Sequence, residues 1–134
     1  MKELFARNNQ EKNKEADKIY LAQCFQRAIK YQVAGNIDAA KRFYGLATIN
    51  NKKMIPEAAY NLAIIYKQEN NIKKAIHYFE AGYQKDKLKQ KSARQLYCLC
   101  EKEGLSIEAD FWLGRIDLSK LATKEKDSSS RPYF

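Results

Sequence analysis

The sequence predicts an all-α protein built from about three stacked helical hairpins, and two observations support this prediction. The segment from Gly35 to Tyr44 returns as the segment from Asn70 to Phe79, which gives an internal period of about 35 residues. The chain also has only 5 glycines and 2 prolines, so long stretches between them are compatible with helix. Because one hairpin cannot bury its own apolar face, such repeats stack into a solenoid with a concave groove.

Composition and charge limit the class of protein. A chain of 134 residues with 45% hydrophobic and 31% charged residues is typical of one globular domain. The net charge of +9 favours acidic partners or surfaces. The first residues lack the apolar core of a secretory signal, and we find no apolar run long enough to span a membrane. We therefore expect a cytoplasmic protein without a transmembrane segment.

The middle repeat carries the clearest pattern and predicts a helix that begins at Pro56. Proline is tolerated in the first turn of a helix because its missing amide would be unpaired there. Ala59, Leu62, Ala63 and Tyr66 then recur at helical spacing, so they form one apolar face. Small residues on such a face let a second helix approach closely.

The pair Asn70 and Asn71 predicts a turn, after which a second helix follows. Its apolar stripe consists of Ile72, Ala75, Ile76, Phe79 and Gly82. The two helices together make a helical hairpin, with its core at the small residues and with Tyr66 and Phe79 filling the space beside them.

These residues resemble the tetratricopeptide repeat (TPR) signature, in which Leu62, Ala63 and Tyr66 are followed by Ala75 and Phe79. The twelve residues from Ala63 to Ala75 match that family, whereas the related Sel1-like repeats carry a longer, glycine-containing turn. The resemblance implies a right-handed α-solenoid of about three TPR-like hairpins. Its repeats would cover residues 21–55, 56–89 and 90–123.

The first and third copies of the repeat have residues at the positions, or columns, that correspond to this signature. The first copy has Ala28, Tyr31, Ala40 and Tyr44, which we expect in the core with the middle repeat. The third copy has Tyr97, Cys100, Ala109 and Leu113 in these columns, with Gly104 in its turn. Terminal repeats are expected to be atypical because one side has no neighbour.

The last helix is broadly apolar and suggests an interface. Phe111, Trp112, Ile116 and their neighbours offer more apolar surface than one hairpin can cover. Trp112 is expected to cap the core of this terminal repeat. If the helix forms an interface instead, the expected arrangement is a homodimer with Trp112 and Ile116 in a two-fold contact. The alternative is that the chain folds back as its own cap and remains monomeric.

The two ends of the chain differ from the repeat domain, which we place at residues 14–123. Residues 1–13 are polar and are interpreted as an N-terminal arm, either a frayed helix or a docking segment. Residues 124–134 lack helical periodicity and are rich in serine and charge, so we expect a disordered tail.

The sequence gives no support for an enzyme. His77 is the only histidine, and neither a phosphate-binding glycine loop nor a nucleophile elbow is found. Cys98 and Cys100 lie two apart on a helix, about 200° around its axis, and so cannot both face one metal ion. We expect neither a cofactor nor a metal site.

A groove is the better candidate site, and the TPR resemblance assigns its lining to the first helix of each repeat. The predicted lining residues are Phe25, Gln26, Ile29, Tyr60, Asn61, Ile64, Lys91, Arg94 and Gln95. The amides of Gln26, Asn61 and Gln95 would hold a peptide backbone, because carboxamides both donate and accept hydrogen bonds. Apolar columns beside them would anchor side chains, unless the chain's own arm fills the groove.

We therefore expect a non-enzymatic adaptor or chaperone that binds an extended or helical peptide of another protein, with Lys91 and Arg94 favouring an acidic one. Some TPR proteins bind acidic chaperone tails through five residues, of which only Asn61 and Lys91 match here. Two alternatives remain open. One is a basic helical-repeat protein that binds nucleic acid, and the other is a secreted bacterial effector built on TPR or Sel1-like repeats.

Overall fold

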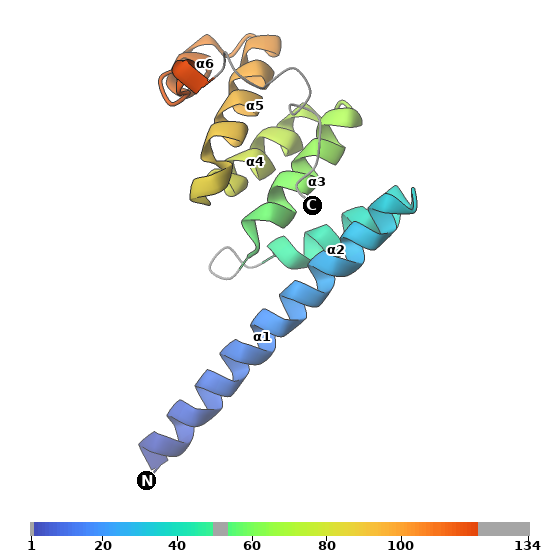
Figure 1. Cartoon of the computed structure of the whole chain (residues 1–134), viewed down its shortest axis with the longest axis vertical. Helices are drawn as coiled ribbons and strands as arrows, with labels where there is room; N and C mark the ends of the chain where they lie inside the picture. The colour runs from blue at the N-terminus through green and yellow to red at the C-terminus, as the bar shows by residue number, and fades with distance from the viewer. Residues whose placement is uncertain (1, 50–53, 121–134) are drawn as a thin grey trace. The chain divides into compact units, whose positions relative to one another are not determined.

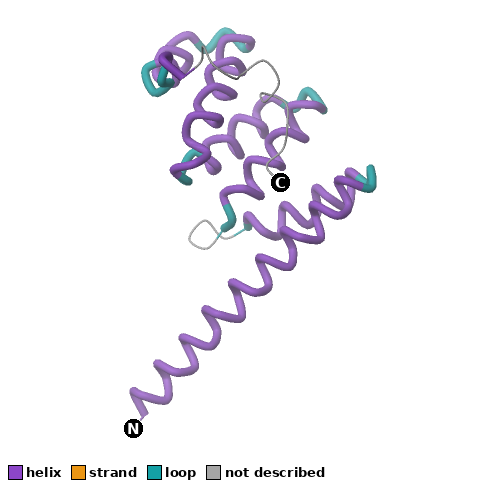
Figure 2. Tube along the Cα trace, in the orientation of Figure 1, coloured by secondary structure: helices purple, strands orange, loops and turns teal. Residues whose placement is uncertain are grey.

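The computed structural model describes residues 2–49 and 54–120, and within these ranges every regular element is a helix (Figures 1 and 2). The α-helices are α1 (Lys2–Val33), α2 (Ile37–Thr48), α3 (Pro56–Gln68), α4 (Ile72–Gly82), α5 (Lys89–Lys102) and α6 (Ser106–Leu113). Two short 3-10 helices, η1 (Asp86–Leu88) and η2 (Leu118–Lys120), complete the set. The all-α prediction is confirmed, and the predicted tail at 124–134 lies outside the described residues.

The chain divides into two compact units. The first unit, residues 1–55, contains α1 and α2, and the second, residues 56–134, contains α3 to α6. The boundary falls where the sequence places the start of the second repeat.

Three helical hairpins, α1–α2, α3–α4 and α5–α6, turn in the same way. In each turn one residue is left-handed, namely Gly35 (φ 84°), Asn70 (φ 62°) and Gly104 (φ 74°). The next amide donates to the carbonyl five residues earlier, from Asn36 to Tyr31, from Asn71 to Tyr66 and from Leu105 to Cys100, each at 2.8 Å. This pairing closes the C-terminus of a helix and suits glycine or asparagine. The internal period is therefore present in the backbone as well as in the sequence.

The residue that follows each turn begins the second helix of the hairpin. Asn36 and Asn71 cap their helices, because their side-chain oxygens accept from the amides of Ala39 (3.2 Å) and Lys74 (3.4 Å). Leu105 has a similar backbone, φ −87° and ψ 75°, but makes no side-chain cap bond. The third copy therefore keeps the turn and lacks the cap.

In the first unit, α2 packs along the C-terminal part of α1. Ala28, Ala40 and Tyr44 are fully buried, as predicted, and the Tyr44 hydroxyl donates to Gln32 Oε1. Helix α1 is much longer than α2 and runs on past it (Figure 1). Every residue from 11 to 20 is exposed. The predicted N-terminal arm is thus part of α1 from Lys2 onward.

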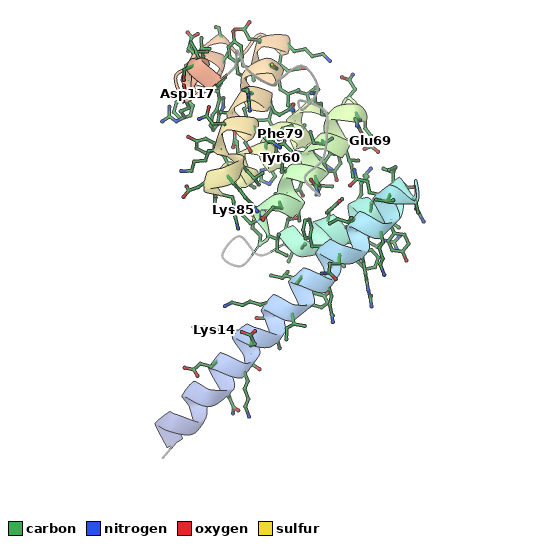
Figure 3. All side chains as sticks on the ribbon, viewed as in Figure 1. Lys14, Tyr60, Glu69, Phe79, Lys85 and Asp117 are labelled. Carbon is green, nitrogen blue, oxygen red and sulfur yellow. The ribbon has the colours of Figure 1, made fainter. Side chains whose placement is uncertain are left out.

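In the second unit, α3 to α6 share one hydrophobic core. The Tyr60 and Phe79 rings meet edge to face with centroids 5.3 Å apart (Figure 3). Gly82 allows close packing, since a Cβ there would lie 3.3 Å from Tyr60 Cβ and 3.4 Å from Ser92 Oγ. The main buried members of this core are Ala63, Ile72, Ala75, Phe79, Leu88, Ala93, Leu96, Leu99, Cys100, Ala109 and Trp112.

Two predicted core tyrosines lie nearer the surface. Tyr31 is 38% exposed and Tyr66 is half-buried. Each stacks on an aromatic ring of the second helix of its hairpin, Phe43 at 5.5 Å and Tyr78 at 5.7 Å between centroids. These tyrosines therefore close the edge of each hairpin, whereas the alanines and Phe79 or Tyr44 fill its centre.

Candidate functional site: the surface of α3 and α5

The predicted groove residues differ widely in exposure. Gln26 is exposed, whereas Phe25, Ile29, Lys91 and Arg94 are half-buried. Tyr60, Asn61, Ile64 and Gln95 are buried. The columns that would combine α1 with α3 span the two units, so their alignment stays a prediction.

The prediction that Tyr60 and Ile64 are apolar anchors of the groove needs revision. Both side chains belong to the core of the second unit, where Tyr60 packs against Phe79. A side chain that is already packed in the core buries no further apolar surface when a ligand binds. Tyr60 and Ile64 therefore stabilise the packing of α3 and do not serve as exposed anchors. Phe25 likewise faces an aromatic partner, Tyr44, at 6.1 Å between centroids.

The predicted ladder of amides is also divided between surface and interior. Asn61 has no solvent exposure and Gln95 has 4%. Only Gln26, in the first unit, is exposed. The buried side-chain amides of Asn61 and Gln95 therefore interact within the protein, where they position neighbouring side chains.

Gln95 positions a lysine that the sequence analysis did not single out. The Lys67 ammonium, on the last turn of α3, donates to Gln95 Oε1 at 2.9 Å. Burial lowers the pKa of Lys67 below its ordinary value; Cys98 opposes this shift and Lys102 adds to it.

The three α5 residues that act on Lys67, namely Gln95, Cys98 and Lys102, lie on one stripe of that helix together with Lys91. Lys91, Gln95, Cys98 and Lys102 recur at intervals of three or four residues, so they share one face of the helix. Arg94 lies beside this stripe. We call the surface made by Lys67 and these α5 residues the basic stripe. It is suited to bind an anion, because ammonium and guanidinium groups donate strong hydrogen bonds to carboxylate or phosphate.

The last hairpin exposes part of the apolar surface predicted for it, but the two residues predicted at the interface, Trp112 and Ile116, are not the exposed ones. Trp112 is 8% exposed and meets Tyr83 edge to face at 5.0 Å, and Ile116 is half-buried. Trp112 therefore packs in the core and cannot serve as the surface anchor of a dimer. The exposed large apolar residues of α6 are Ile107, Phe111 and Leu113.

Within the described residues, the structure gives little support for a metal site or for chemistry at the histidine or the thiols. No group of three or more histidines, cysteines and carboxylates could hold a metal ion there. His77 is exposed and touches the Tyr78 ring. Cys24, Cys98 and Cys100 are free thiols, of which only Cys98 is exposed. None of the described helices has both the length and the apolar character that a membrane span requires.

Comparisons with known proteins found no relative of this chain. No protein-family model matches the chain, and neither curated proteins nor solved structures gave a match.

The sequence contained no signal for the pairing of Lys67 with Gln95. Lys67 lies 28 residues before Gln95, and only the packing of α3 on α5 brings the two together. By contrast, the apolar surface predicted for the last helix includes Phe111, and Ile107 and Phe111 stand where the middle repeat has Lys73 and His77.

Proposed function

We propose that the chain is a non-enzymatic protein-interaction module, an adaptor or chaperone, that binds an acidic segment of a partner protein on the basic stripe. The observation that carries the proposal is the half-buried Lys67 ammonium held by Gln95 at 2.9 Å. Taking an ammonium partly out of water is unfavourable unless an anion or several acceptors surround it. A partner carboxylate would supply that anion.

The position of Lys67 suits a peptide carboxylate. Gln95 fixes the ammonium from one side, and Lys102 adds positive charge near it. Lys91 and Arg94 carry the positive charge toward the N-terminus of α5. An acidic side chain or a C-terminal carboxylate would therefore gain several favourable charges at once.

The repeated hairpins support the class of function. Three hairpins with one turn geometry are a scaffold that presents helix faces. The TPR resemblance of their buried columns favours a peptide ligand.

Fluorescence anisotropy with short labelled peptides tests the proposal. We expect a peptide of alternating glutamate and leucine with a free C-terminus to bind, and its lysine counterpart not to bind. Lys67→Met should weaken binding about tenfold, because it removes one charge-assisted hydrogen bond. Lys73→Met is the matched control, since Lys73 is exposed on α4. Equal binding by both variants, or no binding of the acidic peptide, would contradict the proposal.

Nucleic acid is the alternative ligand, since the chain carries a net charge of +9. A random-sequence oligonucleotide serves as competitor in the same experiment. Tighter binding of the oligonucleotide than of the acidic peptide, with affinity that falls steeply as salt rises, would replace the peptide proposal with this one.

A further inference from the structure

Helix α6 exposes an apolar pair between two acids. Ile107 is 82% exposed and Phe111 is 48% exposed, and the two lie four residues apart, on one face of the helix. Glu108 and Asp110, both exposed, flank this pair on opposite sides, each about 60° around the helix axis from the nearer apolar residue. Leu113 lies about 200° from Phe111 and does not belong to this face. We call the four residues Ile107, Glu108, Asp110 and Phe111 the α6 surface.

The internal repeat shows that this face differs from its two counterparts. The residues that correspond to the apolar pair are polar and exposed in both earlier hairpins, namely Asp38 and Arg42 in α2 and Lys73 and His77 in α4. Those that correspond to the two acids are Ala39 and Lys41 in α2 and Lys74 and Ile76 in α4. The face thus has a net positive charge in α2 and α4, and it is apolar and negative in α6. An apolar patch on an otherwise solvated face marks an interaction site.

The Phe111 ring is held in place from two sides. The Arg115 guanidinium carbon lies 3.5 Å from its centroid, and the Trp112 ring meets it edge to face at 4.9 Å. Arg115 also donates to the Phe111 carbonyl at 3.3 Å. A ring that is already ordered loses little conformational entropy on binding, so this arrangement favours recognition.

The charge around the α6 surface indicates a basic partner. Residues 101–116 hold four acids and two bases, whereas the whole chain has a net charge of +9. One of these two bases, Arg115, already interacts with the ring and the carbonyl of Phe111. A cationic side chain on either side of the apolar pair would meet Glu108 or Asp110, which is the complementary arrangement of charge.

The spacing of the apolar pair indicates a helical partner. Side chains four residues apart form a ridge on a helix, and such a ridge packs into the groove between the side chains of another helix. Apolar residues at helical spacing in the partner would cover Ile107 and Phe111. Lysine or arginine side chains beside them would reach the two acids.

A second copy of this chain is a poorer occupant than a different protein. A two-fold contact would bring Glu108 and Asp110 of two copies together, which is unfavourable. The exposed segment 11–20 of α1 holds three bases and three acids, so it offers no excess of positive charge.

We propose that the α6 surface binds a basic amphipathic helix of another protein. Ile107 and Phe111 provide the apolar contacts, and Glu108 and Asp110 provide the anionic ones. None of the basic-stripe residues takes part, so this binding is independent of the proposed binding of an acidic segment. One chain would then join two partners of opposite charge.

Two labelled synthetic peptides of the same composition, made of leucine and lysine, test the proposal by fluorescence anisotropy with the full chain. In one peptide the leucines recur every three or four residues, which gives a helix with an apolar stripe flanked by lysines. In the other, leucine and lysine alternate, which gives no such stripe. We expect the helical peptide to bind and the alternating one to bind at least about tenfold more weakly. The net charge of +9 repels both peptides alike, so the difference measures the local contact.

Variants of the α6 surface separate its apolar and anionic contributions. Ile107→Lys should weaken binding of the helical peptide about tenfold or more, and the double variant Glu108→Lys with Asp110→Lys should also weaken it. Val33→Lys and Glu80→Lys are the matched controls and should bind like the parent, since Val33 is 70% exposed on α1 and Glu80 is exposed on α4. Circular dichroism should give parental helix content for all variants, because each replaced side chain is exposed.

Three outcomes would overturn the proposal. The first is a parent that does not bind the helical peptide, and the second is an equal loss in the control variants, which would indicate general charge repulsion. The third is a parent mass above 15.6 kDa in multi-angle light scattering that falls to 15.6 kDa in Ile107→Lys, which would assign the surface to a second copy. Lys67→Met should leave the affinity for the helical peptide unchanged, so failure of this proposal is distinguishable from failure of acidic-peptide binding.

Discussion

The second and third hairpins have nearly the same backbone and different surfaces. Both turn at a left-handed residue, Asn70 or Gly104, and both bury a small residue, Ala75 or Ala109, completely. The next large residue differs in its surroundings, since Phe79 is fully buried and Leu113 is 38% exposed. The turn and the small residues therefore set the hairpin geometry, and the large residues decide which face remains open to a partner.

The largest expected effect comes from truncating this large residue in each hairpin. Phe79→Ala should lower the free energy of unfolding by about 3–5 kcal/mol, because it leaves a cavity against Tyr60. Leu113→Ala should cost about 0.5–1 kcal/mol, since its side chain is already partly in water. Urea denaturation of the two variants measures the difference. Equal losses would mean that the third hairpin is packed like the second.

Enlarging the small residue of the first helix should give the next largest effect. Ala63 has no exposure, so Ala63→Leu should overpack α3 against α4 and cost about 1–3 kcal/mol. At the corresponding position of α5, Tyr97 is half-buried, and Tyr97→Leu should cost less than about 1.5 kcal/mol. Thermal melts followed by circular dichroism compare the pair. A parental melt for Ala63→Leu would show that the assigned register of α3 is wrong.

The caps of the second helices predict changes of opposite sign. Asn71→Ala removes the hydrogen bond to the Lys74 amide and should cost about 1 kcal/mol. Leu105→Asn supplies the missing cap on a suitable backbone and should stabilise the protein by about 0.5–1 kcal/mol. Urea denaturation measures both changes, and a destabilised Leu105→Asn would contradict the capping argument.

The smallest effect concerns the pH dependence of Lys67. Its pKa is lowered from 10.5 in the folded protein, so burial of the charged form opposes folding at neutral pH. This cost disappears as pH rises through the lowered pKa toward the value of the unfolded chain, and stability rises over that range. Lys67→Met lacks this dependence. We expect the stability of Lys67→Met relative to the parent to decrease from pH 7 toward pH 10, and a constant difference would contradict the lowered pKa.

Much of the fold could be predicted from sequence because local signals determine it. Asn70, Asn71 and Gly104 mark turns by their backbone preferences, and Pro56 marks the first turn of α3. Helical periodicity then identified the stripe from Ile72 to Gly82. For residues 1–13 the sequence left a frayed helix and a docking segment as alternatives, since a polar segment without an apolar stripe gives only a weak signal, and the structure has helix from Lys2.

The candidate site was less predictable, because exposure depends on packing between hairpins. Tyr60 and Ile64 share the apolar period of α3, and the sequence alone could not say which apolar face α4 and α5 cover. The partnership of Lys67 with Gln95 is likewise a tertiary contact. The basic stripe could be inferred in part through Lys91 and Arg94, which belong to one helix.

The shared turn also allows the local opening of the three hairpins to be compared within one molecule. The backbone amides of Asn36, Asn71 and Leu105 donate equivalent hydrogen bonds, each 2.8 Å long, to the carbonyl five residues earlier. After correction for intrinsic rates, hydrogen exchange at these three amides reports how often each hairpin opens. One experiment on one molecule can thus rank the three copies by stability, without any substitution.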